Sequence, residues 1–447
     1  MKPELLCPAG SRKSMRYAYA YGADAVYIGQ PRYSLRVREN EFFKLAVIDE
    51  AVTEAHRQQK KVYIASNIAP HNAKVRSYLR DMEPVIAMKP DALIMSDPGL
   101  IMMVRERWPD VPVHLSVQAN TVNFAAVKFW QKLGLERIIL SRELSLEEIA
   151  EIRQECPDME LEVFVHGALC IAYSGRCLLS GYMANRDPNQ GACTNACRWK
   201  YQATEAVQTE EGNYVPTGAE EQEGLKQEHS CCKEGEHDLP GKDKVFLLQE
   251  KMRPDEVMPA WEDEHGTYIM NSKDLRAIQH VRKLVELGID SLKIEGRTKS
   301  HYYAARTAQA YRKAIDDAVA GQAFDESLMD SLDGLANRGY TDAFYERHRP
   351  NQLQNYDMGN SNQKSRQFVG ELVEQRDGLG RVEVKNQFRV GDQLELMTPT
   401  STVNFVLEQM KDKSGKDIEL VSGSGQQVDI LLPQKMDLDF GLLTVSR

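Results

Sequence analysis

The feature that most constrains the fold is a regular alternation of short aliphatic segments with amphipathic helical stretches, which continues to about Gly296. Such alternation is typical of a parallel sheet whose strands are joined by helical crossovers. Eight strands of this kind predict a closed barrel, and an open doubly wound sheet is the alternative that the same pattern permits. The predicted strands are residues 4–7, 25–29, 62–66, 92–96, 113–117, 137–141, 161–165 and 291–294.

A weak internal repeat indicates that one strand–helix unit is reused. Gly22, Gly134 and Gly288 are each followed by an acidic residue two positions later and then by a predicted strand. Glycine at that place is typical of a helix that ends in a left-handed conformation. The sequence SLEE at 145–148 is a capping box and predicts the start of a helix after the sixth strand. Ser272 is the predicted N-cap of a further helix that ends at Gly288.

The rest of the chain divides into an insertion, a linker and a second domain. Residues 168–270 separate the seventh and eighth strands, and within them residues 205–238 predict a solvated, mobile loop. Residues 302–320 predict a helix, and short alternating strands after residue 368 predict an all-β module. The α/β fold predicted is a TIM-barrel-like domain at 1–325 with the insertion at 168–270, a helical and polar linker at 326–366, and a small β-barrel-like domain at 367–447.

The charge balance limits the kind of partner. The chain carries 56 lysines and arginines against 66 aspartates and glutamates, a net charge of −10. This excludes a polycation that coats nucleic acid, so a polyanionic partner requires a local basic patch. Without a long apolar run or a secretory leader pattern, we expect a soluble cytoplasmic protein with no membrane partner.

Four of the eight cysteines lie close together in the insertion, with the spacing C-x6-C-x15-C-x3-C. A cytosolic chain of this size disfavours a disulfide framework. Four thiolates suit zinc or an iron–sulfur cluster, and the C-x2-C pairs common in zinc sites are missing. Four unligated thiols are the simpler alternative. The four residues are Cys170, Cys177, Cys193 and Cys197, whereas Cys231 and Cys232 are predicted to be free thiols.

Polar residues follow most of the predicted strands. In parallel α/β folds the loops at the carboxyl ends of the strands converge on one open face, where reactive groups gather. Each residue alone is typical of a helix cap or a turn, but their convergence on one rim indicates a site. These residues are Gln30, Arg32, Asn67, Asp97, Gln118, Asn120, Arg142, Glu143, Glu295 and Arg297.

Two histidines lie on predicted strands. His114 is within a strand and is predicted to be buried and hydrogen-bonded. His166 ends the seventh strand four residues before Cys170, which permits a Cys/His dyad for nucleophilic catalysis. This hypothesis competes with metal binding, because a thiolate that ligates a cluster cannot also attack a peptide.

Basic residues gather at 32–38, at 74–80 and at 297–313, where tyrosines are interleaved. Arginine binds carboxylate or phosphate through two hydrogen bonds, and aromatic side chains stack on unpaired bases. Solvated helix faces account equally well for the second cluster and for most of the third. The cluster that begins at Arg32, directly after a strand end, is the preferred ligand site.

Several motifs together carry a resemblance that covers almost the whole chain. PELLCPAG at 3–10, YGADAVY at 21–27, HGALC at 166–170, SGRC at 174–177 and KIEGR at 293–297 resemble the collagenase-like peptidase family of unknown catalytic type. NIAPHNAK at 67–74 and RDPNQG at 186–191 are similar to the branch of that family that hydroxylates tRNA. Other branches hydroxylate ribosomal RNA or a quinone precursor.

The resemblance implies an enzyme, a tRNA uridine hydroxylase that uses prephenate and no oxygen to convert the wobble uridine of the anticodon loop to 5-hydroxyuridine. It also implies a 4Fe-4S cluster, whose ligands fall on Cys170, Cys177, Cys193 and Cys197. The small dicarboxylate co-substrate is expected to bind arginines, and the candidates are Arg32, Arg36, Arg142 and Arg297. The electron donor is not specified by the sequence.

Two other functions stay open. Neither a G-x-S-x-G elbow nor an H-E-x-x-H helix occurs, so a peptidase would depend on His166 and Cys170. A non-enzymatic RNA-binding protein with a structural metal would use the basic clusters and the β module without chemistry.

Overall fold

The computed structural model describes residues 2–34, 41–68, 70–169, 201–208, 214–216, 245–250, 253–263, 266–269, 273–337, 339–346, 366–376, 378–433 and 438–446. The cysteines predicted as ligands and the loop that contains Arg36 lie outside these ranges.

Eight parallel strands form a closed barrel, as predicted. They follow the chain from β1 to β7, and β14 closes the ring because it pairs in parallel with both β7 and β1. The strands are short runs of buried aliphatic residues, which suits a sheet covered on both faces. Their bounds are Glu4–Pro8 (β1), Ala25–Gly29 (β2), Lys61–Ser66 (β3), Ala92–Met95 (β4), Val113–Leu115 (β5), Arg137–Ile139 (β6), Glu160–Ala168 (β7) and Ser291–Ile294 (β14).

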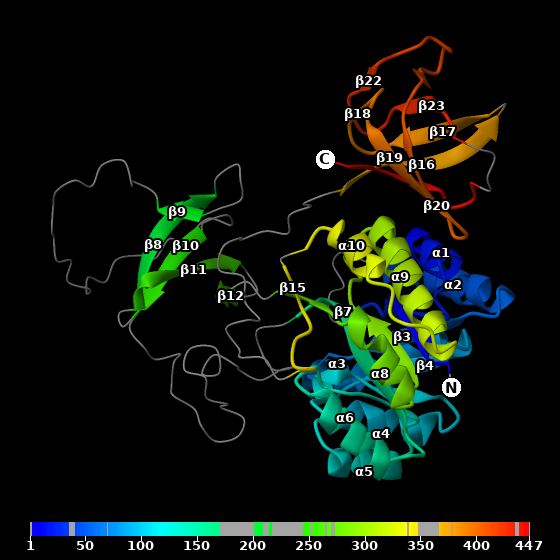
Figure 1. Ribbon diagram of the computed structural model, residues 1–447. Coiled ribbons are helices and arrows are strands. Elements are labelled where there is room, and N and C mark those ends of the chain that lie inside the picture. The colour runs from blue at the N-terminus through cyan, green and yellow to red at the C-terminus, as the bar shows by residue number, and fades with distance from the viewer. Residues whose placement is uncertain are drawn as a thin grey trace.

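Helices cover the outer wall of the barrel (Figure 1). Nearby residues define where these helices begin. The predicted capping box at Ser145 is present, and Asp97 caps the helix that begins at Pro98. The bounds are Arg12–Ala20 (α1), Leu45–Arg57 (α2), Asn72–Ala87 (α3), Pro98–Arg107 (α4), Phe124–Lys132 (α5), Leu146–Glu155 (α6), Val281–Glu286 (α8), His301–Val319 (α9) and Ser327–Asp333 (α10).

The insertion leaves and rejoins the barrel at one place. Strand β13 (Asp274–Arg276) pairs antiparallel with the end of β7, so Ala168 and Asp274 are register partners. The described part of the insertion forms a separate antiparallel sheet, green in Figure 1, with the order β12-β11-β10-β8-β9. Its strands are Tyr201–Gln208 (β8), Tyr214–Pro216 (β9), Val245–Glu250 (β10), Arg253–Asp263 (β11) and Gly266–Ile269 (β12).

Two local predictions are wrong in this region. Residues 205–208 and 214–216, predicted as part of a loop, belong to β8 and β9. The helix predicted from Ser272 starts only at Val281, because residues 274–276 pair with β7 and with the short strand Tyr340–Thr341 (β15). Non-local pairing overrides the local helical spacing there.

The C-terminal domain is antiparallel β-structure, as predicted, with its own apolar core. A seven-stranded sheet has the order β20-β19-β24-β16-β17-β23-β21, and β18 pairs with β22. The bounds are Arg366–Arg376 (β16), Leu379–Val384 (β17), Phe388–Arg389 (β18), Gln393–Met397 (β19), Thr402–Val406 (β20), Met410–Lys411 (β21), Leu420–Val421 (β22), Gln427–Leu431 (β23) and Leu442–Ser446 (β24).

The C-terminal sheet docks on α1 and α9 through buried carboxylates. Glu371 on β16 pairs with Lys13 on α1 at 2.5 Å, and Glu395 on β19 pairs with Arg306 on α9. Both carboxylates are almost fully buried. A buried charge is tolerated when it is paired, so these contacts fix the position of the sheet on the two helices.

Among the helices in the described ranges, none combines the length and hydropathy that a bilayer span requires.

Candidate active site at the mouth of the barrel

The carboxyl ends of the barrel strands bring polar side chains to one rim, which we call the mouth. Asn67 follows β3 and donates from Nδ2 to the Ser116 hydroxyl after β5 at 3.3 Å. Ser96 follows β4 and donates to the Asn67 carbonyl at 3.1 Å. These bonds tie three consecutive strand ends together. The expected convergence therefore occurs on this side of the barrel.

Arg142 and Glu295 form the charged pair of the mouth. Arg142 follows β6 in the chain. Its guanidinium lies 3.9 Å from the centre of the Phe164 ring and donates to the Ala168 carbonyl at 2.7 Å. Its Nη2 is 3.7 Å from Glu295 Oε2, and Tyr27 donates to the same oxygen at 3.3 Å. The two charged side chains keep 14% and 11% of their surface exposed, so they are held in place yet remain in reach of a ligand.

Arg297 lies near the Tyr27 ring. Its guanidinium is 5.7 Å from the centre of the Tyr27 ring, and Nη1 donates to the Ser34 hydroxyl at 2.8 Å. Arg297 thus lies near the Tyr27 ring, and Arg142 is connected to Tyr27 through Glu295. Two guanidinium groups are suitable partners for a ligand with two carboxylates.

The other predicted arginines are placed differently. Arg32 is exposed and points to α3, where Nη1 contacts Asp81 Oδ2 at 2.6 Å. Arg36 lies outside the described residues. The structure thus separates the Arg32 side chain from the pair formed by Arg142 and Glu295.

Two glycines allow the ends of β7 and β14 to approach closely. Gly167 has φ +107°, and a Cβ there would lie 2.4 Å from the Glu295 carbonyl oxygen. Gly296 has φ +149°, and its Cβ would lie 2.6 Å from Tyr303 Cε1. Glycine is the residue that tolerates both the conformation and the contact. These glycines explain the HG and EG pairs of the sequence motifs and hold Glu295 at the mouth.

His166 lies away from the mouth, between β7 and α9. Its ring is 1% exposed and packs beside Tyr303, Tyr311 and Tyr340 at centroid distances of 5.5 to 5.8 Å. Nδ1 is 3.3 Å from the Tyr311 hydroxyl, and Nε2 has no partner among the described residues. Burial lowers the pKa of His166 to about 3. The imidazole is therefore neutral near pH 7, and the dyad with Cys170 stays a prediction because Cys170 is not described.

The four cysteines predicted as cluster ligands, Cys170, Cys177, Cys193 and Cys197, lie outside the described residues, as do Cys231 and Cys232. Cys170 is two positions beyond the end of β7 in the chain. Cys7 and Cys156 are free and buried, and burial raises the pKa of Cys7. Neither is a candidate nucleophile, since the thiolate is the reactive form.

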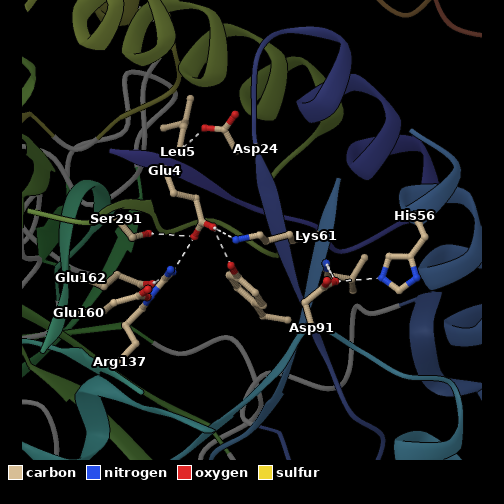
Figure 2. A network of polar contacts seen from close by, with 12 residues as sticks. Glu4, Leu5, Asp24, His56, Lys61, Asp91, Arg137, Glu160, Glu162 and Ser291 are labelled. Atoms are coloured by element: carbon tan, nitrogen blue, oxygen red, sulfur yellow. Dashed lines mark hydrogen bonds and ion pairs between the residues drawn. The ribbon is translucent and has the colours of Figure 1, made fainter. Parts of the chain in front are cut away.

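A charged network fills the lumen beneath the mouth, and the sequence interpretation missed it. Lys293 Nζ lies 2.8 Å from Glu162 Oε1, and Arg137 Nη1 bridges Glu162 Oε2 at 3.2 Å and Glu4 Oε1 at 2.6 Å. Figure 2 shows Glu4 at the centre of this network, with Ser291 and Lys61 also directed toward it. The signal in the sequence was a charged residue at an inward position of an otherwise apolar strand.

Titration in the lumen follows from burial and pairing. Burial alone would raise the pKa of Glu4, but Arg137 and two hydrogen bonds hold that pKa below its ordinary value. Burial lowers the pKa of Lys293 against the opposing pull of Glu162. His114 is buried as predicted, packs edge-on against Tyr63 at 4.7 Å, and its Nδ1 lacks a partner in the part of the chain that the structure describes.

Comparison with known proteins agrees with this architecture. The family model described as peptidase family U32 matches residues 10–355, and the model of the U32 C-terminal domain matches residues 364–442. Proteins named tRNA hydroxylation protein P from Haemophilus influenzae and Escherichia coli are 58% and 59% identical, over 99% of this chain and 96% of each relative. A protein of the same name from Helicobacter pylori is 37% identical over 77% of this chain and 72% of its own length. The chain belongs to peptidase family U32.

Proposed function

We propose that this protein is an enzyme that hydroxylates a uridine of tRNA. The observation that carries the proposal is the near full-length similarity, at 58% and 59% identity, to proteins named tRNA hydroxylation protein P. The mouth supports it, because it offers polar groups and two guanidinium groups, of which Arg142 pairs with Glu295 and Arg297 donates to Ser34.

The finer proposal is an oxygen-independent hydroxylation of the wobble uridine to 5-hydroxyuridine, with prephenate as co-substrate. Prephenate carries two carboxylates, and the mouth offers Arg297 near the Tyr27 ring and Arg142 beside Glu295, which accepts a hydrogen bond from Tyr27. Arg142 is oriented by the Ala168 carbonyl and by Glu295, so its free N–H groups have a fixed direction. Charge-assisted hydrogen bonds of this kind orient a carboxylate as well as binding it.

The proposed cofactor is a 4Fe-4S cluster held by Cys170, Cys177, Cys193 and Cys197. The donor set fits, since four thiolates are the common ligands of such clusters. The place also fits, because Ala168, which accepts a hydrogen bond from Arg142, is two positions before Cys170 in the chain. When bound, the cluster would supply electron transfer.

The residues of the chain have defined tasks in this proposal. Arg142 and Arg297 bind the dicarboxylate, and Glu295 holds Arg142 in place. Tyr27 orients Glu295 through its hydroxyl group. His166, with a pKa of about 3, stays neutral and serves the packing of α9.

The test combines cofactor analysis with a product assay. The protein is purified without oxygen for its visible spectrum and its iron and sulfide content. A deletion strain that lacks the protein is complemented with wild type, with Cys193→Ser or with the control Cys232→Ser. The tRNA nucleosides of each strain are then measured by mass spectrometry. We expect 5-hydroxyuridine with wild type and Cys232→Ser, and a loss of product and of iron with Cys193→Ser.

Other outcomes separate the alternatives. A colourless zinc protein, or full product with Cys193→Ser, would overturn the role of the cluster. Peptide hydrolysis that survives Cys193→Ser would favour the peptidase. Binding of tRNA by wild type without any hydroxylated product would favour a non-enzymatic RNA-binding protein.

A further inference from the structure

A basic surface lies beside the mouth, on α3 and the loop after β2. It consists of Arg32, Lys74, Arg76 and Arg80, and we call it the α3 basic face. Arg76 is exposed, and the side chains of Arg32 and Arg80 are 57% and 78% exposed. In a chain with a net charge of −10, such a cluster is a local departure from the average.

The acidic residue within this face leaves it cationic. Asp81 accepts from Arg32 at 2.6 Å and from Arg80 at 3.2 Å. Arg76 pairs with no carboxylate in the part of the chain that the structure describes. Glu83, the other carboxylate of α3, pairs with Arg107 of α4 at 3.6 Å. Four cations against these two carboxylates still leave an excess positive charge on the surface.

The face is held rigid by a buried tyrosine. Tyr33 is fully buried, and its hydroxyl donates to Asp81 at 2.8 Å and contacts Ser77 Oγ at 2.8 Å. Lys74 Nζ donates to the Arg32 carbonyl at 2.9 Å, so the loop after β2 is bound to α3. Preformed cations lose less conformational freedom when they bind a partner.

The face is continuous with the mouth. Ser34, two residues after Arg32, accepts a hydrogen bond from Arg297 at 2.8 Å. Helix α3 begins six positions after β3 ends, so its amino end and positive dipole lie at the carboxyl side of the barrel. Its first turn has no acidic residue, whereas the first turn of α6 carries Glu147 and Glu148. Negative charge is therefore accommodated on the α3 side of the rim.

We infer that the α3 basic face binds the phosphate backbone of the tRNA arm whose uridine enters the mouth. This inference rests on the proposed function and adds the surface that delivers the substrate. Phosphates bound by arginine and lysine position a nucleic acid without reading its sequence. The base is then left free to enter the mouth beside Arg297.

The test is tRNA binding by the full-length protein as a function of salt, with Arg76→Gln/Arg80→Gln. The control is Arg57→Gln/Lys132→Gln, which removes the same charge from the last turns of α2 and α5, at the amino-terminal end of the barrel. Each phosphate contact contributes about 0.7 to the slope of log K against log salt for a single strand. The loss of two contacts lowers the slope by about 1.4. If wild type and variant bind equally at 1 M salt, the variant then binds about 25-fold more weakly than wild type at 0.1 M salt.

We expect this loss in the α3 variant alone, with turnover at saturating tRNA unchanged. Equal affinity and equal salt slope in wild type, the α3 variant and the control would overturn the inference even if the enzyme makes 5-hydroxyuridine. Conversely, binding that depends on Arg76 and Arg80 without any product from wild type would overturn the proposed function and keep the inference. Exposed Arg→Gln and Lys→Gln changes are expected to leave the stability of the fold almost unchanged, so folding does not confound the comparison.

Discussion

Replacement of Lys293 by methionine tests whether the lumen network stabilises the barrel as a balanced set of charges. The Lys293 ammonium lies 2.8 Å from Glu162, and the two side chains are 4% and 0% exposed. Arg137 is the other cation near Glu162, at 3.2 Å, and it also pairs with Glu4 at 2.6 Å. Lys293→Met leaves Glu162 and Glu4 with Arg137 as the one buried cation of this network, beside the exposed Lys61 that contacts Glu4.

The cost follows from the unpaired charge. Removal of one partner from a buried ion pair destabilises a protein by about 3–5 kcal/mol. Because Arg137 stays beside Glu162, we expect the lower value, about 3 kcal/mol. Adding Glu162→Gln removes the unmatched carboxylate, so the double variant is expected to be more stable than the sum of the single effects by about 1–3 kcal/mol.

Urea unfolding of the full chain, followed by far-UV circular dichroism and by tryptophan fluorescence, measures these differences. Trp108 is the C-cap of α4 and Trp130 lies on α5, so both report on the barrel domain. The matched control is Lys283→Met, an exposed lysine on α8, for which we expect a change below about 0.5 kcal/mol. An unchanged midpoint for Lys293→Met, or strictly additive effects in the double variant, would refute the reasoning.

Two further predictions concern His166 and Gly167. The native pKa of His166 is about 3 against an ordinary value of 6.5, so between these values the unfolded chain binds a proton that the native chain does not. The free energy of unfolding therefore rises by about 1.4 kcal/mol per pH unit in this window and falls again as the pH is lowered. We expect His166→Phe to remove this contribution, measured by urea unfolding at several pH values. An unchanged dependence of stability on pH would contradict the prediction. Gly167→Ala should lower the free energy of unfolding by more than about 1 kcal/mol and reduce the amount of 5-hydroxyuridine. The control is Gly288→Ala, which should keep full activity because a Cβ there, at φ +73°, meets nothing within 4 Å. Equal effects of the two changes would exclude the contact with Glu295 as the cause.

The barrel was predictable because its signals are local. Each strand is a short apolar run, and its helix begins at a cap such as Ser145 that neighbouring residues complete. The mouth was predictable for the same reason, since polar residues after parallel strands share one edge. Arg142 and Arg297 were found in this way.

What the sequence did not reveal depends on contacts between distant residues. The helical spacing after Ser272 carried no sign that residues 274–276 pair with β7. Glu162 and Lys293 lie far apart in the chain, so their pairing in the lumen was invisible. The side chain of Arg32 was expected at the ligand, but Asp81 on α3 pairs with it.

The pairing of Ala168 with Asp274 has an evolutionary consequence. Everything between them is attached by a two-stranded stem, and chain length between fixed ends affects closure weakly, by about 0.6 kcal/mol for each doubling. The segment beyond the four cysteines is therefore exchangeable: it can lengthen, shorten or be replaced while the strands that precede Arg142 and Glu295 keep their register. Within one family, a common scaffold can in this way carry modules that diverge at their own pace.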